Sequence, residues 1–370
     1  SKGIEWLYLA NIFMLTPTLS ETAEVAESSV IRNAQESFRW RDDKDAVSPL
    51  NLAIGNVFLP MHPGMLKRAR DVDADHHPLK NGSVPYSATV GSDSARAAIL
   101  NVIGAPGFDV EGLYSHITAG GTGAMELMIR TCCQKGKPLM LIEPFYTNYK
   151  ELAAKLGIPV VSVGRTLQED GKFSIPDPKQ IGEQIEKTGA NAIVVIPYDN
   201  PCGQFLSQEV LVEIARICVE KNIWMVSDEA YRGLVYTGEQ PSSIWGVTEE
   251  QAPGIKGRRI GIESASKLFN ACGERMGALV TDNKILHQQA VNLATPELCA
   301  SVRGQHTLSA LGEESKVDIM KWTEGLREYY RGLITSTVEA FRGRMPDLLV
   351  SNPDASIYFV LDFRKIDPNF

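Results

Sequence analysis

The middle of the chain alternates short apolar runs with stretches of helical periodicity, and this alternation limits the possible folds most strongly. Apolar runs typical of buried strands occur at residues 139–143, 160–163, 192–197, 223–228, 260–264 and 278–281. Helical patterns lie between them, including 147–156 and 207–221, and Ser207 is the expected N-cap of the second. Because these strands are apolar throughout, they predict an α/β fold with a mainly parallel sheet covered by helices on both faces.

The length of 370 residues exceeds what one hydrophobic core usually supports, so more than one domain is expected. We expect residues 1–64 to form an N-terminal arm and part of a small α+β domain, and residues 65–312 to form a large domain. A long helix at 313–344, with Leu326 and Tyr330 on its apolar stripe, is expected to link the two. Residues 313–370 then comprise this helix and the C-terminal part of the small domain, with a strand at 356–362, and that domain is expected to be incomplete at residue 370.

Charge and cysteine usage exclude several classes of protein. The net charge of −8 argues against a nucleic-acid-binding surface, which is basic as a rule. No apolar stretch reaches the roughly 18 residues needed to span a bilayer, and residues 4–15 are interrupted by Glu5 and Asn11, which favours an arm or helix over a signal peptide. The six cysteines form no C-x-x-C pair and no cluster with histidines, so we expect neither a disulfide framework nor a metal site. Free cysteines are typical of a reducing compartment, so we expect a cytoplasmic location.

Polar side chains follow three successive strands of the expected sheet. Asn200 comes after the run at 192–197, Asp228 ends the run at 223–228 with Tyr231 three residues later, and Lys267 follows the run at 260–264. Each alone has an ordinary explanation, since Asn-Pro-x-Gly is a common turn and Asp a common helix cap. Ligands of open parallel sheets bind at the carboxyl ends of the strands. An amide, a carboxylate, a phenol and an amine at neighbouring ends therefore predict a binding site.

A glycine-rich turn at residues 117–125, before a helical stretch, predicts the phosphate end of this site. Glycines let the backbone approach a ligand closely, and a helix N-terminus presents free N–H groups. The spacing is not G-x-G-x-x-G, so NAD binding is not supported. Lys267 offers an amine for a covalent bond, and separate groups are available for a single phosphate. Pyridoxal phosphate requires both features. Together with Arg275, Ser264 and Ser266, the glycine-rich turn suits a single phosphate monoester.

Four separated motifs carry a resemblance to a known family. They are Asn200-Pro201-x-Gly203, Asp228-x-Ala230-Tyr231, Ser264-x-Ser266-Lys267 and Arg275-x-Gly277. They occur in the order and approximate spacing of fold-type I pyridoxal-phosphate enzymes. From about residue 51 to residue 362 the chain resembles the class I/II aminotransferases, which include aspartate aminotransferase. The resemblance is specific for the family and not for a substrate.

The resemblance implies a role for each matching position at the cofactor ring. Lys267 would form the internal aldimine and later move protons between the substrate and the cofactor. Asp228 would pair with the protonated pyridine nitrogen. Asn200 and Tyr231 would donate hydrogen bonds to the phenolic oxygen of the ring, and Tyr146 would stack on the ring face.

Further positions are implied for the phosphate, the substrate and the partner subunit. Gly121, Thr122, Ser264, Ser266 and Arg275 would hold the phosphate, and Gly55, together with Asn200, would approach the substrate near its carboxylate. Tyr86 resembles the tyrosine that reaches the phosphate of a neighbouring subunit, which implies a homodimer. The arginine that usually binds the α-carboxylate of the substrate is expected beyond residue 370.

The function expected is a transaminase reaction of the ping-pong type, in which an L-amino acid gives its amino group to the cofactor and a 2-oxo acid receives it. Two alternatives stay open. The same site can perform other chemistry at the α-carbon, as a β-lyase, a decarboxylase or an enzyme like ACC synthase. Less in keeping with the sequence is a regulator that binds the cofactor without turnover, since no basic helix-turn-helix segment is present.

Overall fold

The computed structural model describes residues 18, 20, 23, 30–48, 52 and 55–367. The chain divides into two compact units, Ser1–Ile54 and Gly55–Phe370. The described part of the first unit contains helix α3 (Val30–Arg39). The arm expected at residues 4–15 lies outside the described residues. The second unit contains all of the expected site residues, and the domain boundaries expected near residues 64 and 312 remain predictions.

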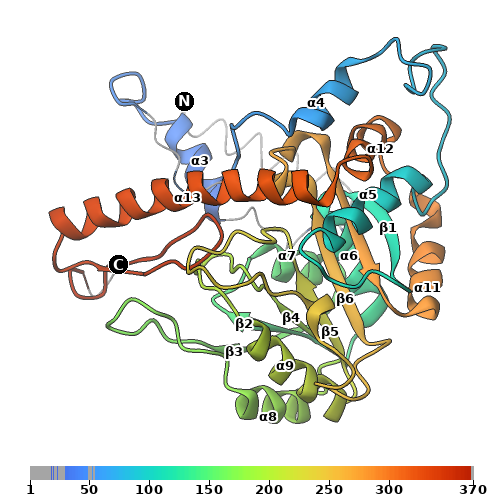
Figure 1. The fold of residues 1–370 in the computed structure, drawn as a ribbon. Coiled ribbons are helices and arrows are strands. Elements are labelled where there is room, and N and C mark those ends of the chain that lie inside the picture. The colour runs from blue at the N-terminus through green and yellow to red at the C-terminus, as the bar shows by residue number, and fades with distance from the viewer. Residues whose placement is uncertain are drawn as a thin grey trace. The chain divides into compact units, whose positions relative to one another are not determined.

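A seven-stranded sheet forms the centre of the second unit (Figure 1), with the strand order β1-β7-β6-β5-β4-β2-β3. Strand β7 runs antiparallel to both of its neighbours, and the other pairs are parallel. The prediction of an α/β fold with a mainly parallel sheet is confirmed. The strands are β1 (Tyr114–Ala119), β2 (Leu139–Glu143), β3 (Val160–Gly164), β4 (Ala192–Val195), β5 (Trp224–Asp228), β6 (Arg259–Ser264) and β7 (Met276–Thr281).

Successive side chains of a strand point to opposite faces of the sheet, and both faces of this sheet are buried. In β2, Leu139 and Leu141 pack into one apolar cluster and Met140 and Ile142 into the other. The first cluster is completed by α6 (Gly120–Cys132), α7 (Asn148–Lys155) and α11 (Lys284–Ala294). The second is completed by α5 (Asp93–Gly104), α8 (Pro178–Thr188) and α9 (Gln208–Glu220). This is why the strands lack a polar face in the sequence.

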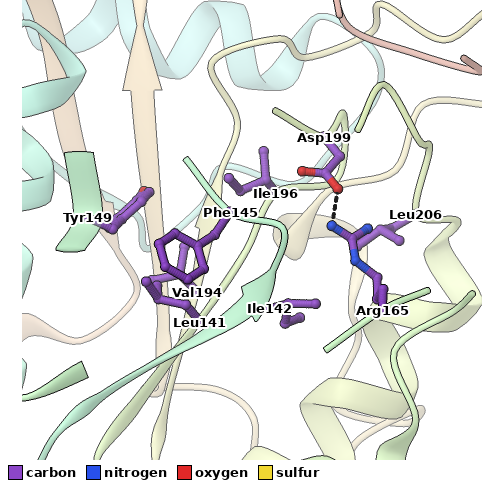
Figure 2. A pocket seen from close by; sticks show the side chains of 9 residues that line it. All are labelled: Leu141, Ile142, Phe145, Tyr149, Arg165, Val194, Ile196, Asp199 and Leu206. Atoms are coloured by element: carbon purple, nitrogen blue, oxygen red, sulfur yellow. Dashed lines mark hydrogen bonds and ion pairs between the residues drawn. The ribbon is translucent and has the colours of Figure 1, made fainter. Parts of the chain in front are cut away.

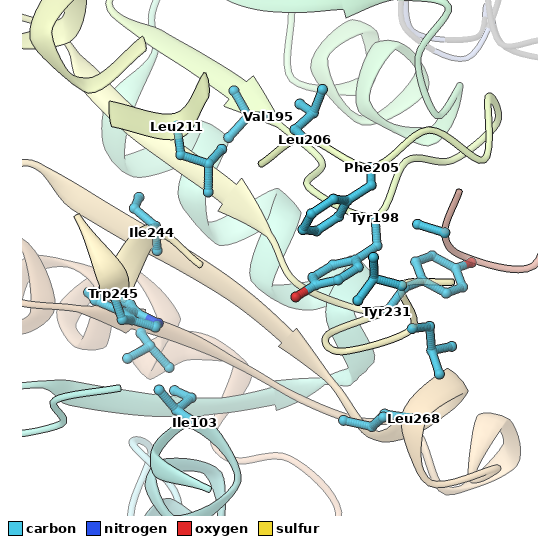
Figure 3. Packing of buried hydrophobic residues seen from close by; sticks show 14 of the residues in the cluster. Ile103, Val195, Tyr198, Phe205, Leu206, Leu211, Tyr231, Ile244, Trp245 and Leu268 are labelled. Carbon is cyan, nitrogen blue, oxygen red and sulfur yellow. The ribbon is translucent and has the colours of Figure 1, made fainter. Parts of the chain in front are cut away.

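The second cluster extends to the elements around the candidate site (Figure 3). Figure 3 shows the ring of Tyr231 among the same buried side chains as Tyr198 and Phe205, whose ring centroids are 5.5 Å apart. The remaining elements are α4 (Pro63–Arg70), α10 (Ala265–Leu268), α12 (Val302–Ser309), α13 (Lys316–Arg344), β8 (Leu349–Val350), β9 (Leu361–Asp362) and the short 3-10 turns η1 (Ile244–Gly246), η2 (Cys272–Glu274), η3 (Thr295–Glu297) and η4 (Ala310–Gly312).

The long helix expected at 313–344 is α13, which crosses Figure 1 in orange-red. It begins three residues later than expected, where the Ser315 hydroxyl accepts a hydrogen bond from the Asp318 amide at 3.1 Å. Its predicted apolar stripe is buried at Leu326, Tyr330 and Ile334. Within the described ranges, no helix combines the length and apolarity needed to cross a membrane.

Two strands differ from the expectation for identifiable reasons. Strand β1 was not expected, because it carries the polar residues Ser115 and His116, which are buried all the same. The strand predicted at 356–362 is wrong over most of its length. Ser356 has a φ of +66°, so the backbone turns there, and only Leu361–Asp362 pairs, with Leu349–Val350.

A buried charge network fixes the chain directly after β5. Arg232 is 2% exposed and forms ion pairs with Glu229, at 3.1 Å, and with Glu263 on β6. One oxygen of Glu229 accepts hydrogen bonds from the Ser227 and Ser243 hydroxyls, each at 2.9 Å. One guanidinium faces two carboxyl groups, and burial raises the pKa of Glu263. The network thereby holds the turn that carries Asp228 and Tyr231.

Replacing Arg232 with alanine is expected to lower the free energy of unfolding by about 3–5 kcal/mol, because two buried carboxyl groups lose their cation. Urea unfolding followed by circular dichroism measures this loss. The control is Arg331→Ala, since Arg331 and its partner Glu328 have side chains 52% and 50% exposed, and its cost is expected to stay below about 1 kcal/mol. Equal losses in the two variants would contradict the role given to the buried network.

Candidate active site

The expected site residues gather at one edge of the sheet because six strands share a direction. Asp228 ends β5 and Ser264 ends β6, while the α6 glycines directly follow β1. Arg275 precedes β7, and because β7 is antiparallel to its neighbours, its N-terminal end lies at the same edge of the sheet. The register pairs Ser264 with Gly277 and Ala119 with Met276, which sets the ends of these strands side by side.

The contact between β7 and the first turn of α6 is a backbone contact. A Cβ added to Gly277 would lie 2.4 Å from the Gly120 carbonyl carbon and 2.5 Å from the Gly121 nitrogen. Gly120 itself has a φ of +75°, and a Cβ there would overlap the Arg275 guanidinium. Gly121 lies against Ser264, whose Cβ is 3.4 Å from the position of an added Cβ. The groups expected to hold the phosphate therefore form one cradle.

The cradle is suited to an anion by its partial charges. Helix α6 has 13 residues, and its N-cap Ala119 supplies no side-chain hydrogen bond to the first amides. These N–H groups, at Gly121 and Thr122, carry the positive end of the helix dipole. The Arg275 guanidinium donates to the Cys272 carbonyl at 2.9 Å, which leaves further N–H donors on its planar fork.

Lys267 projects from α10, a single turn that begins directly after β6. The Ser264 hydroxyl starts this turn by accepting a hydrogen bond from the Ser266 amide at 3.2 Å. The half-buried Lys267 amine donates to the Gly55 carbonyl and lies 3.8 Å from the Cys272 sulfur. Burial lowers the pKa of Lys267, the Cys272 thiol opposes this, and the nearby Arg275 charge adds to it. A neutral amine is the form that can act as a nucleophile.

Asp228 is 6% exposed and is held at both oxygens. It accepts a hydrogen bond from the Tyr149 hydroxyl at 2.9 Å and from the Ala230 amide at 3.2 Å. Burial raises the pKa of Asp228 to about 6, even though both hydrogen bonds favour the ionised form. Ionising this buried carboxyl costs more free energy than ionising one in water, and a cation beside it would offset that cost.

Three tyrosines surround the space beside Asp228. The hydroxyls of Tyr231 and Tyr358 are 2.8 Å apart, and their rings meet edge to face. Burial raises the pKa of Tyr146 to about 12. The Tyr146 ring also meets the ring of Tyr149 edge to face, with centroids 6.4 Å apart, and Tyr149 is the residue that donates to Asp228.

The loops that carry Tyr146 and Asn200 are joined by a buried ion pair (Figure 2). Arg165, which follows β3, pairs with Asp199 and also donates to the Pro144 carbonyl at 3.1 Å. Both charged side chains are nearly fully buried, at 2% and 4% exposure. Burial raises the pKa of Asp199 against the pull of Arg165. The cavity that this pair lines with Phe145 has about 10 Å³, enough for one water molecule, so it is packing space and not a substrate site.

Tyr86 lies apart from the other expected residues within this chain. Its side chain is 76% exposed. The loop that carries it is tied to α12, because the buried Gln305 side chain donates to the Ser87 hydroxyl at 3.0 Å and accepts from the Ser92 amide at 2.7 Å.

Sequence reasoning missed Tyr149, Tyr358 and Cys272, all of which contact expected site residues. Tyr149 lies in α7, where it looks like one more apolar position of the helix. Tyr358 lies within the wrongly predicted strand. Cys272 is five residues from Lys267, and only the turn η2 folds its sulfur back toward the amine. The only indication of this contact in the sequence is that Cys272 follows Lys267 by five residues.

Among the described residues, no cluster of three or more His, Cys, Asp or Glu side chains can hold a metal ion.

Comparison with known sequences places these features in a family. The sequence pattern "Aminotransferase class I and II" matches residues 48–369. The human kynurenine–oxoglutarate transaminase 3 is 28% identical over 265 residues, which cover 68% of this chain and 56% of that protein. The aspartate/prephenate aminotransferase of Thermus thermophilus is 27% identical over 312 residues, which cover 80% of this chain and 74% of that protein. The chain thus spans little more than half the length of the first of these relatives.

Solved structures share the fold. The aspartate aminotransferase of Thermus thermophilus with maleate superposes with a TM-score of 0.80 at 24% identity, covering 95% of this chain and 87% of the other. The N-succinyldiaminopimelate aminotransferase of Mycobacterium tuberculosis gives a TM-score of 0.75 at 23% identity, covering 94% and 84%. At this identity the likeness concerns the fold alone.

Replacing Asp228 with asparagine is expected to stabilise the ligand-free protein at pH 7. The carboxyl has its ordinary pKa of 3.8 in the unfolded chain and a pKa of about 6 in the folded one, so the folded state binds the extra proton and loses stability as the pH rises from about 4 to 6. The gain at pH 7 is at most about 3 kcal/mol, from about two pH units at 1.36 kcal/mol each. Urea unfolding at pH 4 and pH 7 measures it, and a gain of the same size at pH 4 would contradict the assignment.

Proposed function

Because the chain belongs to the aminotransferase class I and II family, we propose that it is a pyridoxal-phosphate-dependent aminotransferase, which moves an amino group between an L-amino acid and a 2-oxo acid by a ping-pong mechanism. Enzymes of this family depend on pyridoxal phosphate. The observation that carries the proposal is that a half-buried amine, Lys267, and a buried carboxyl, Asp228, lie at the same sheet edge as an anion cradle.

The residues present fit the cofactor at each of its polar groups. When bound, pyridoxal phosphate supplies an aldehyde that condenses with amines and a cationic ring that accepts electrons. The cradle of Gly121, Thr122, Ser264, Ser266 and Arg275 has the donors that a phosphate monoester needs. Gly120 and Gly277 lack the side chains that would fill it.

Asp228 would hold the proton on the ring nitrogen. Its carboxyl has a pKa of about 6 in the ligand-free protein because of burial, and a cation beside it would bring that pKa down and keep the group ionised. The Tyr149 hydroxyl and the Ala230 amide already point at its two oxygens. The carboxylate is thus oriented before the cation arrives, which reduces the reorganisation needed on binding.

Lys267 would take a proton at Nζ from the α-carbon of the substrate and return it at the neighbouring position of the cofactor. Its lowered pKa leaves more of the amine in the neutral form that accepts a proton. Tyr231 and Asn200 would donate to the phenolic oxygen of the ring, and Tyr146 would cover one ring face. The Gly55 backbone would approach the substrate near its carboxylate.

Lysine 267 is tested by borohydride reduction of the protein loaded with pyridoxal phosphate, followed by peptide mapping. We expect the label on Lys267, and Lys267→Ala is expected to lose about 10²–10⁴-fold or more in transaminase rate, the contribution of a positioned proton-transfer group. The control is Lys284→Ala, at an exposed amine on α11, which should keep the rate. A label on another lysine would overturn the proposal, and ammonia release without a 2-oxo acid would instead indicate lyase chemistry.

We further propose a homodimer in which Tyr86 reaches the phosphate of the other subunit. Mixing and refolding Tyr86→Ala with Lys267→Ala tests this. If Tyr86 acts across the interface, each mixed dimer has one intact site, and random mixing restores roughly a quarter of the wild-type rate. If Tyr86 acts within its own chain, or the protein is a monomer, no mixture exceeds the rate of Tyr86→Ala alone.

A further inference from the structure

Tyr358 contacts the site through the hydroxyl of Tyr231. The two phenolic oxygens are 2.8 Å apart, and the rings meet edge to face with centroids 5.7 Å apart at 80°. The residues are separated by 127 positions in the sequence. Tyr231 is 4% exposed, so its hydroxyl has few other partners available. This hydrogen bond links the C-terminal segment to the turn after β5.

The position of Tyr358 is fixed by contacts with two glycines. A Cβ on Gly55 would lie 2.5 Å from the Tyr358 hydroxyl oxygen, so this hydroxyl occupies the space that any larger residue would need. A Cβ on Gly203, whose φ is +69°, would overlap the Tyr358 carbonyl oxygen. The Gly203 carbonyl also accepts hydrogen bonds from the amides of Asp354, at 2.8 Å, and Ala355, at 2.9 Å. The segment is thus anchored on the loop that carries Asn200.

A second set of contacts anchors the same segment on the chain after Tyr231. The Ser356 amide donates to the Leu234 carbonyl at 2.9 Å, and the Tyr236 hydroxyl donates to the Ser356 carbonyl. The Tyr236 amide donates to the Asp354 carbonyl at 2.7 Å. The backbone on the N-terminal side of Tyr358 is therefore bonded to the chain that follows Tyr231.

We propose that Tyr358 is a positioning residue that donates its proton to Tyr231 and so orients the Tyr231 hydroxyl toward the phenolic oxygen of the cofactor, an inference that rests on the proposed function. A phenol has one proton and can accept other hydrogen bonds through its lone pairs. If Tyr231 gives its proton to the cofactor, the 2.8 Å bond requires Tyr358 to be the donor. Gly55 then serves to admit the Tyr358 hydroxyl.

The hydrogen bonds from Tyr358 to Tyr231 and from Tyr231 to the cofactor have a measurable consequence for the bound cofactor. A chain of hydrogen bonds polarises its members, so Tyr231 becomes a stronger donor while Tyr358 donates to it. A stronger donor stabilises negative charge on the ring oxygen and lowers the pH at which the cofactor band changes its absorption. Other titratable groups facing the two tyrosines are Asp228 on β5, Tyr146 after β2, Cys272 before β7 and Tyr330 on α13, and none of them changes in the variants below.

The experiment compares the pH midpoint of the cofactor absorption band in the loaded full chain. Tyr231→Phe is expected to raise the midpoint by about 1–2 units, the value of a hydrogen bond to a charged group. Tyr358→Phe is expected to raise it by about 0.2–0.6 units, the roughly 10–30% that cooperativity adds to a hydrogen bond worth about 2 units. In the double variant, the effect of Tyr358→Phe should vanish, because the two residues act through one hydrogen bond.

The matched control is Tyr236→Phe, which removes a phenol hydroxyl that bonds to the C-terminal segment at Ser356 and not to Tyr231. Its midpoint should stay at the wild-type value even if its thermal stability falls.

The proposal is overturned if Tyr358→Phe leaves the midpoint within about 0.1 unit of the wild-type value, if Tyr236→Phe shifts it equally, or if the shift persists in the Tyr231→Phe background. Failure of the proposed function has a different signature, because the wild-type chain would then give no cofactor band that borohydride fixes to Lys267.

Discussion

The common direction of six strands is the constraint on which the candidate site depends. Parallel pairing brings the ends of β2, β4, β5 and β6 to one edge, and the antiparallel β7 delivers Arg275 to that edge from the other sense. The contact between Gly277 and the first turn of α6 then sets the distance between the arginine and the free amides. A side chain at Gly277 would separate β7 from α6, and the anion cradle would lose its shape.

Buried charge supports this arrangement at two places. Arg232 between Glu229 and Glu263 holds the turn after β5, and Arg165 with Asp199 joins the loops after β2, β3 and β4. Burying charged side chains costs desolvation free energy, and burying apolar side chains in their place would not. What the charges provide is direction, because a guanidinium fixes the orientation of each carboxylate that it contacts. Among the described residues, Asp228 has no ion-pair partner, and burial raises its pKa to about 6.

The C-terminal segment completes the site rather than extending the sheet. Its backbone turns at Ser356 and binds the loops at Gly203 and Leu234, which puts Tyr358 beside Tyr231 and Gly55. A regular strand at 356–362 would have pointed alternate side chains to opposite faces. The positive φ of Ser356 is therefore part of how the Tyr358 hydroxyl reaches the tyrosine of the opposite segment.

The sequence by itself determined the sheet class, most of the strands and helices, and the strand-end groups Asn200, Asp228, Tyr231, Ser264 and Lys267, because apolar runs and turn motifs are local patterns that burial imposes directly. It did not indicate β1, whose buried polar residues disguise it, and it misread the strand at 356–362.

Only the tertiary structure decided which distant groups meet: Tyr149 with Asp228, Tyr358 with Tyr231, and Cys272 with Lys267. Such contacts join residues through the packing of separate elements, and no spacing along the chain encodes the distance between two side chains once the backbone has turned.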